Sequence, residues 1–106
     1  MTTDQPRKKA LFPLGRLSAT AGAITALQLQ RQDLVPYMQR HALGDWGCVC
    51  PEDAALNDEA VREGNRILSA YAIDPAKPCK GYGENCLWVI TEADRSVTTF
   101  LLPEEY

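Results

Sequence analysis

The chain has 106 residues, a hydrophobic fraction of 45% and a formal net charge of −3. These values suit one globular domain, and they lack the clustered positive charge of a nucleic-acid-binding face. No apolar run reaches the ~20 residues that a bilayer span needs, and no apolar segment of a secretory signal follows the basic residues near the N-terminus. We therefore expect a cytoplasmic protein with a flexible polar tail over residues 1–10 and a single domain over residues 11–106.

The first half of the domain is predicted to be helical after an extended lead-in. Residues 11–19 are apolar but contain Pro13, which a central strand does not tolerate, so this segment is predicted to be a lead-in or a short edge strand. Thr20 is a suitable N-cap for a first helix, and Asp33 is a suitable N-cap for a second. Gly44 would end the second helix in a left-handed conformation.

A third helix is predicted between Pro51 and Gly64. Proline is favoured in a first helical turn, because the N–H that it lacks has no partner there. Glycine is the usual residue just past a helix end. Leu56 and Ala60 lie four residues apart, so we expect them to form the buried stripe of this helix.

The second half of the domain changes to the pattern of extended strands. Residues 66–73, 86–91 and 97–102 are the three predicted strands, and the last two are rich in β-branched and aromatic residues. Short connections between consecutive strands favour antiparallel neighbours. We therefore predict an α+β fold, with N-terminal helices packed on one face of a three-stranded antiparallel β-meander. The meander has four strands if residues 11–19 contribute an edge strand.

Four cysteines fall in two pairs that a helix and a strand separate. Cys48 and Cys50 form a C-x-C before the third helix, and Cys79 and Cys86 flank a loop between two strands. Two chain segments that each supply two thiolates form the layout of a structural zinc site, with His41 as a further possible ligand. The spacings differ from the usual C-x-x-C, so free buried thiols, a disulfide and a redox pair stay open as alternatives. We interpret the four cysteines as ligands of a structural zinc.

A polar turn over residues 91–99 offers an alternative, catalytic interpretation. Cleavage of a phosphodiester needs a general base, a cation that stabilises the developing charge, and a hydroxyl that holds an oxygen. Glu92 or His41, then Arg95, and then Thr98 would take these roles. The same residues are ordinary turn and strand chemistry, and a lone histidine on the apolar face of a helix is typically a packed residue. We therefore favour a protein without catalytic residues and leave enzymatic activity open.

Three segments of the chain are similar to a known protein family. Residues 44–47 read GDWG, residues 67–71 read ILSAY, and residues 88–106 read WVITEADRSVTTFLLPEEY. In these segments the chain resembles a family of short, plasmid-associated bacterial proteins, also found on conjugative elements and prophages, that end in W-x-I-T-E-A-D-R-S-x-T-T-x-L-L-P-x-E-Y. The similarity covers nearly everything after Leu11. It implies the setting of a mobile genetic element and no particular reaction.

The chain differs from the common form of that family in two places. There the position of Cys48 is commonly acidic, and the loop before the second strand is shorter and lacks residues 79–86. Because extra cysteines are found in both segments of this chain, the comparison with the family suits a shared ligand role.

Two functional classes follow from these observations. The preferred one is a non-catalytic binding protein of a bacterial mobile genetic element, an inhibitor of a host defence complex of the anti-CRISPR kind, with a protein partner of open identity. Its expected partner-binding residues are Trp46, Tyr82, Trp88, Asp94 and Arg95. The alternative is a small ribonuclease or toxin-like enzyme that uses the turn formed by Glu92, Asp94, Arg95 and Thr98. The predicted order of helices before a meander is similar to that of barnase-like and RelE-like toxins, which is a likeness of fold alone.

Overall fold

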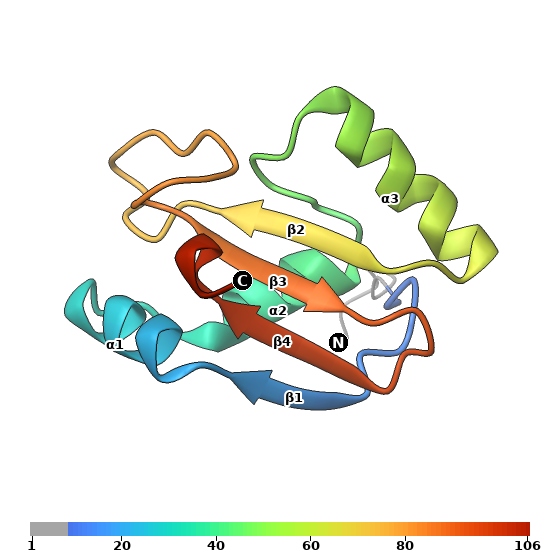
Figure 1. The fold of residues 1–106 in the computed structure, drawn as a ribbon, viewed down its shortest axis with the longest axis horizontal. Coiled ribbons are helices and arrows are strands. Elements are labelled where there is room, and N and C mark those ends of the chain that lie inside the picture. Colours follow the sequence, from blue (N-terminus) through green and yellow to red (C-terminus); the bar gives the residue numbers. More distant parts are fainter. Residues whose placement is uncertain (1–8) are drawn as a thin grey trace, which may run out of the picture.

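The computed structural model describes residues 9–106 as one mixed β-sheet with three α-helices (Figure 1). The expected polar tail over residues 1–10 lies almost entirely outside the described residues. The elements in chain order are β1 (Arg16–Ala19), α1 (Ala21–Leu29), α2 (Leu34–Ala42), α3 (Pro51–Glu63), β2 (Ile67–Tyr71), β3 (Leu87–Thr91), β4 (Val97–Leu101) and the short 3-10 helix η1 (Pro103–Glu105).

The helices α1 and α2 begin at the predicted caps, and α3 ends at the predicted glycine. The side chain of Thr20 accepts a hydrogen bond from the backbone N–H of Ala23 at 3.1 Å, and that of Asp33 accepts one from Val35 at 3.4 Å. Gly64 ends α3 in the left-handed region, with φ at 80°. The caps satisfy N–H groups that a helix leaves unpaired at its start. Within the described part of the chain, no helix has both the length and the apolarity to cross a membrane.

The sheet is mixed, which corrects the prediction of a purely antiparallel meander. Strands β2, β3 and β4 are antiparallel neighbours as expected, in the order β1-β4-β3-β2. The fourth strand is β1, which pairs in parallel with β4 from Arg16 opposite Val97 to Ala19 opposite Phe100. No short turn joins β1 to β4, so no local signal specifies their direction. Three helices and the strands β2 and β3 lie between them in the sequence, so their pairing is a long-range contact.

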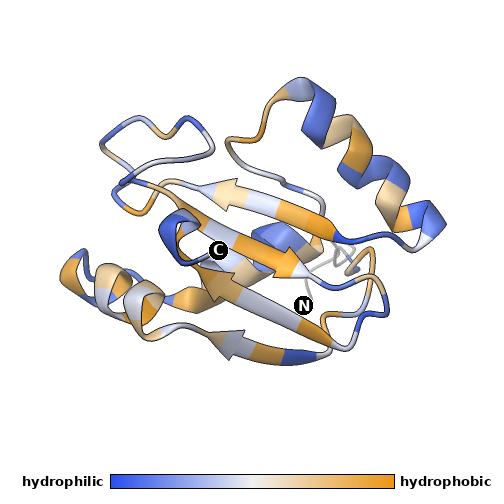
Figure 2. Ribbon diagram, viewed as in Figure 1, coloured by the Kyte–Doolittle hydropathy of each residue, from blue (hydrophilic) through white to orange (hydrophobic). Residues whose placement is uncertain are grey.

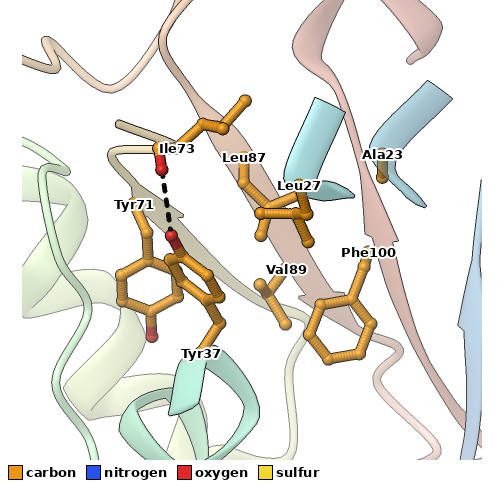
Figure 3. Packing of buried hydrophobic residues seen from close by; sticks show 8 residues of the cluster. All are labelled: Ala23, Leu27, Tyr37, Tyr71, Ile73, Leu87, Val89 and Phe100. Carbon is orange, nitrogen blue, oxygen red and sulfur yellow. Dashed lines mark hydrogen bonds between the residues drawn. The ribbon is translucent and has the colours of Figure 1, made fainter. Parts of the chain in front are cut away.

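The main core lies between the sheet and the helices α1 and α2, which cover one face. Alternate residues of β2, β3 and β4 point to this face, because side chains alternate along a strand. The cluster consists of Ala23, Leu27, Tyr37, Tyr71, Ile73, Leu87, Val89 and Phe100 (Figure 3). The buried Tyr37 hydroxyl donates to the carbonyl of Ala72 at 3.0 Å, and it also lies near that of Ile73. A buried tyrosine hydroxyl needs such a partner.

Helix α3 lies beside β2 and packs on it through only one of the two expected residues. Ala60 is buried as predicted, but Leu56 is 61% exposed and Asn57 takes its place. The Asn57 amide donates to the Leu68 carbonyl at 2.7 Å and accepts from the Leu68 N–H at 3.2 Å. Strand β2 is at the edge of the sheet, where backbone groups lack a neighbouring strand. An asparagine that satisfies both groups is therefore favoured over a leucine at this position.

The opposite face of the sheet carries the C-terminal end of the chain. In Figure 1, η1 lies in front of the strands, whereas α2 lies behind them. The ring of Tyr106 meets Trp88 edge-on, with centroids 5.6 Å apart. Glu105 accepts a hydrogen bond from the hydroxyl of Thr20 at 2.6 Å, which ties η1 to the start of α1.

Candidate functional site

His41 lies at the centre of a buried chain of hydrogen bonds that joins α2 to β2, β3 and β4. Its Nδ1 is 2.6 Å from Ser69 Oγ, and its Nε2 is 2.8 Å from Thr91 Oγ1. Thr91 Oγ1 is 2.6 Å from Thr98 Oγ1, and the Thr98 hydroxyl donates to the Leu14 carbonyl at 2.7 Å. The four side chains are wholly buried.

The Leu14 carbonyl, at the end of this series of hydrogen bonds, determines which imidazole nitrogen of His41 carries the proton. Because a carbonyl only accepts, Thr98 donates to it, and Thr91 must therefore donate to Thr98. His41 then donates from Nε2 to Thr91, and Ser69 donates to Nδ1. Burial, and secondarily the charge of Arg95, lowers the pKa of His41 to about 4. The imidazole is thus a neutral structural connector whose two nitrogens are both occupied.

Arg95, the cation of the catalytic alternative, binds backbone carbonyls of its own chain. Its guanidinium donates to the Ala60 carbonyl at 2.9 Å and to the Asn65 carbonyl at 2.7 Å. These carbonyls lie at the C-terminal end of α3, where a positive charge is favoured. Asp94, its exposed neighbour, accepts from the N–H of Ser96 at 3.0 Å, which is typical of a turn.

The residues of the catalytic alternative therefore do not meet around one accessible point. His41 and Thr98 are buried in the interior, and Arg95 closes the end of α3. Glu92 is half-buried at the start of the turn, where its backbone N–H donates to Val97 at 3.1 Å. A phosphodiester that reached Glu92 would find neither the imidazole nor the Thr98 hydroxyl exposed to it.

Three of the four cysteine thiols converge. Cys79, in the loop between β2 and β3, is close enough to Cys48 and Cys86 to influence the pKa of both thiols. Burial, followed by the contact with Cys79, raises the pKa of Cys48 to about 11, and the same causes raise the pKa of Cys86. Cys50 is exposed at the N-cap position of α3, where its side chain makes no capping hydrogen bond.

Backbone contacts bring the two cysteine segments together. The N–H of Cys48 donates to the Ala70 carbonyl at 2.6 Å, so the segment before α3 runs alongside β2. Gly81 packs on the Cys48 carbonyl so closely that a Cβ at Gly81 would lie 3.1 Å from that oxygen. The indole of Trp88 donates to the Gly81 carbonyl at 2.9 Å, which holds the loop over β3. Across residues 9–106, no group of three or more His, Cys, Asp or Glu side chains is already in position to hold a metal ion.

A groove of about 340 Å³ opens beside the thiols, between the start of α3, the loop and the sheet. It brings together two of the expected partner-binding residues, Tyr82 and Trp88, of which Tyr82 is 65% exposed. The groove is also lined by Cys50, Asp53, Leu68 and Lys80. Sequence reasoning missed Leu68 and Asp53. Only the register of β2 against β3, with Ala70 opposite Trp88, places Leu68 on the same face of the sheet as Trp88.

The other expected partner-binding residues lie elsewhere. Trp46 is 6% exposed, stacks on Phe12 and donates from its indole to Asp58 at 2.9 Å, so its expected place on an exposed surface is wrong. Its position between two glycines suggested a loop residue, whereas the approach of α3 covers it. Asp94 is exposed but follows the end of β3 that is distant from Trp88, and Arg95 is beside it.

The exposed side of α3 is strongly acidic. Five carboxylate side chains of this helix are exposed, against one arginine: Glu52, Asp53, Asp58, Glu59 and Glu63, with Arg62. Hydrophilic residues accordingly recur along α3 in Figure 2. Asp53 belongs to both the acidic surface and the groove, so the two features are continuous.

Comparison of the chain with models of known protein families, with curated proteins and with solved structures gave no match. The groove, the acidic helix and the converging thiols are therefore the features from which a function is inferred.

Proposed function

We propose that the chain is a non-catalytic binding protein of a bacterial mobile genetic element that inhibits a host defence complex of the anti-CRISPR kind. The observation that carries this proposal is the groove in which exposed Tyr82 and half-buried Trp88 meet beside acidic α3. The setting of a mobile element comes from the family resemblance of residues 88–106.

The groove has the composition of a protein-binding surface. Tyrosine and tryptophan dominate binding energy at interfaces, because they bury a large area and lose little side-chain entropy. Trp88 is held by Gly81 and Tyr106, so this part of the surface is already ordered before a partner arrives. Leu68 adds an apolar side chain to the lining of the groove.

The acidic helix indicates the charge of the partner. A row of exposed carboxylates attracts a basic surface and accelerates its association. Complexes that bind nucleic acid carry such basic surfaces, since they neutralise phosphates with Lys and Arg. A protein that presents α3 to such a surface would compete with the nucleic acid for it, while the groove supplies apolar contact.

A transformation assay tests the proposal. Bacterial hosts, each with one active CRISPR type that targets a plasmid, would express the chain, and the transformation efficiency of that plasmid would be measured. We expect the wild-type chain to restore transformation in at least one host. Tyr82→Ala is expected to abolish most of this effect, because loss of an aromatic anchor costs about 2 kcal/mol of binding, or roughly 30-fold in affinity.

The matched control is Leu29→Ala, which removes an apolar side chain that is 78% exposed and lies outside the groove. It should protect the plasmid as the wild type does. Failure of the wild type in every host, or full activity of Tyr82→Ala, would contradict the proposal. RNA cleavage by the purified chain that disappears in both Arg95→Ala and Glu92→Ala would support the ribonuclease alternative instead.

A further inference from the structure

We propose that Cys48, Cys79 and Cys86, joined by Cys50, bind one structural zinc ion that fastens the loop between β2 and β3 to the start of α3. The proposal does not depend on the proposed binding function, since the site would hold the fold together whatever its partner. It concerns four side chains from two segments that lie far apart in the sequence.

Three of the ligands are already neighbours. The loop that carries Cys79 and Cys86 packs on the Cys48 segment, where a Cβ at Gly81 would lie 3.1 Å from the Cys48 carbonyl oxygen. Cys86 is wholly buried, and the backbone of Cys48 is held against β2 by its hydrogen bond to Ala70. A metal at this point would therefore bind to side chains whose backbones are anchored in the sheet.

Cys50 is the fourth ligand by position. It is exposed, but it lines the same groove as Lys80 and Gly81, the two residues that follow Cys79. Because its side chain makes no capping hydrogen bond, its sulfur can turn toward the loop without breaking one. Within residues 9–106 no three such side chains already form a metal-binding group, so zinc binding would turn the thiols of both segments toward one point.

The donor set of the proposed site has the composition of a structural zinc site. Sulfur is a donor that zinc prefers, and the chain offers four cysteines from two segments whose backbones meet at Gly81 and Cys48. Zinc accepts four sulfur ligands at about 2.3 Å in a tetrahedral site. A site with four protein ligands has no open position, so its role is structural.

The loop that carries Cys79 has few other attachments. Asn85, at the end of the loop, binds its beginning. It accepts from the Asp74 N–H at 2.8 Å and donates to the Pro78 carbonyl at 3.1 Å. Between these ends, Trp88 holds the loop at Gly81. A zinc ion would add covalent attachment of this loop to the α3 segment, and it would thereby also position Tyr82 in the groove.

Elemental analysis of the purified wild-type chain, expressed with zinc in the medium, is the direct test. We expect one zinc per chain, and replacement by Co²⁺ should give the thiolate-to-cobalt charge-transfer and visible absorption of a tetrahedral sulfur site. Cys48→Ser and Cys79→Ser should lose the metal. Cys50→Ser should retain it with at least about tenfold weaker affinity, since three anchored thiolates remain. Leu29→Ala is the control and should bind as the wild type does.

A variant that fails to fold does not decide the question, so the wild-type chain is also stripped with a chelator and titrated with zinc. We expect zinc to restore protection of the loop at Lys80 against trypsin. A folded, zinc-free chain that takes up no added zinc would overturn the proposal. So would a disulfide at Cys79, shown by a mass lower by two hydrogens and by the mass of the linked peptides, or undiminished zinc in Cys79→Ser. None of these results would affect the transformation assay, so the two proposals fail separately.

Discussion

The buried His41 is expected to make the stability of this fold depend on pH well above the range in which carboxylates titrate. Folding lowers the pKa of this side chain from 6.5 to about 4, mainly by burial. As the pH falls, the unfolded chain therefore takes up a proton before the folded chain does. The stabilisation is fully present above about pH 6.5 and is lost as the pH falls toward about 4.

The size of the effect follows from the difference between the two pKa values. Each pKa unit corresponds to about 1.36 kcal/mol, so the shift from 6.5 to about 4 amounts to about 3 kcal/mol when fully lost. At about pH 5 the loss is about 2 kcal/mol, because the folded state is still mostly neutral there. That is a large share of the ~5–15 kcal/mol that stabilises a typical domain.

Urea denaturation at about pH 7, 6 and 5 measures this dependence. The chain contains one histidine, so NMR of its ring proton reports His41 without ambiguity. The control is His41→Gln, which cannot titrate in this range and should show a much shallower dependence, although it is less stable at neutral pH. An unchanged free energy of unfolding between about pH 7 and 5 in the wild type would refute the reasoning. A folded-state titration midpoint at the ordinary histidine value would also refute it.

Two further predictions concern the attachment of α3 and its entry segment. Asn57→Ala should lower the free energy of unfolding by about 2–3 kcal/mol, because it leaves both backbone groups of Leu68 without a partner. Leu56→Ala, on the exposed side of the same helix, should change it by less than about 0.5 kcal/mol in urea denaturation, and equal effects would contradict the assigned role of the asparagine. Gly47→Ala should destabilise by about 3 kcal/mol or more, because the backbone has φ at 75° and a Cβ would collide with the β2 backbone. Gly83→Ala has a similar φ of 89° in open space, so thermal denaturation should show a cost of only about 1 kcal/mol, and a similar loss for both glycines would refute the collision.

Long-range packing explains where sequence reasoning about the site failed. The polar turn looked catalytic because Glu92, Arg95 and Thr98 are close in the sequence. Alternation along β4 turns Thr98 into the interior, where it binds Thr91 and the Leu14 carbonyl. Arg95 turns toward the end of α3 and binds the carbonyl of Asn65, which lies 30 residues before it in the sequence. Neither the buried contacts of Thr98 nor the contacts of Arg95 with α3 can be predicted from the sequence of the turn alone.

The cysteines show the opposite case, in which a pattern pointed to a long-range contact. The expectation that the two segments meet rested on paired spacing, and the structure packs Gly81 of the loop on the Cys48 carbonyl, whereas a shared metal site stays a proposal. The position of Cys50 could not be predicted in the same way. Its rotamer depends on the N-terminus of α3 and on the groove, and a C-x-C spacing carries no information about either.

The amino-acid sequence by itself determined where the helices begin and end and which residues form β2, β3 and β4. Caps such as Thr20 and Gly64 and the alternation of strand residues act between positions a few residues apart, so their energetics can be read locally. Tertiary structure alone decided that β1 joins β4 in parallel, that Trp46 is covered and that His41 is held neutral between strands. Each of these depends on burial and pairing between segments far apart in the chain, and such contacts exist only once the whole domain has closed.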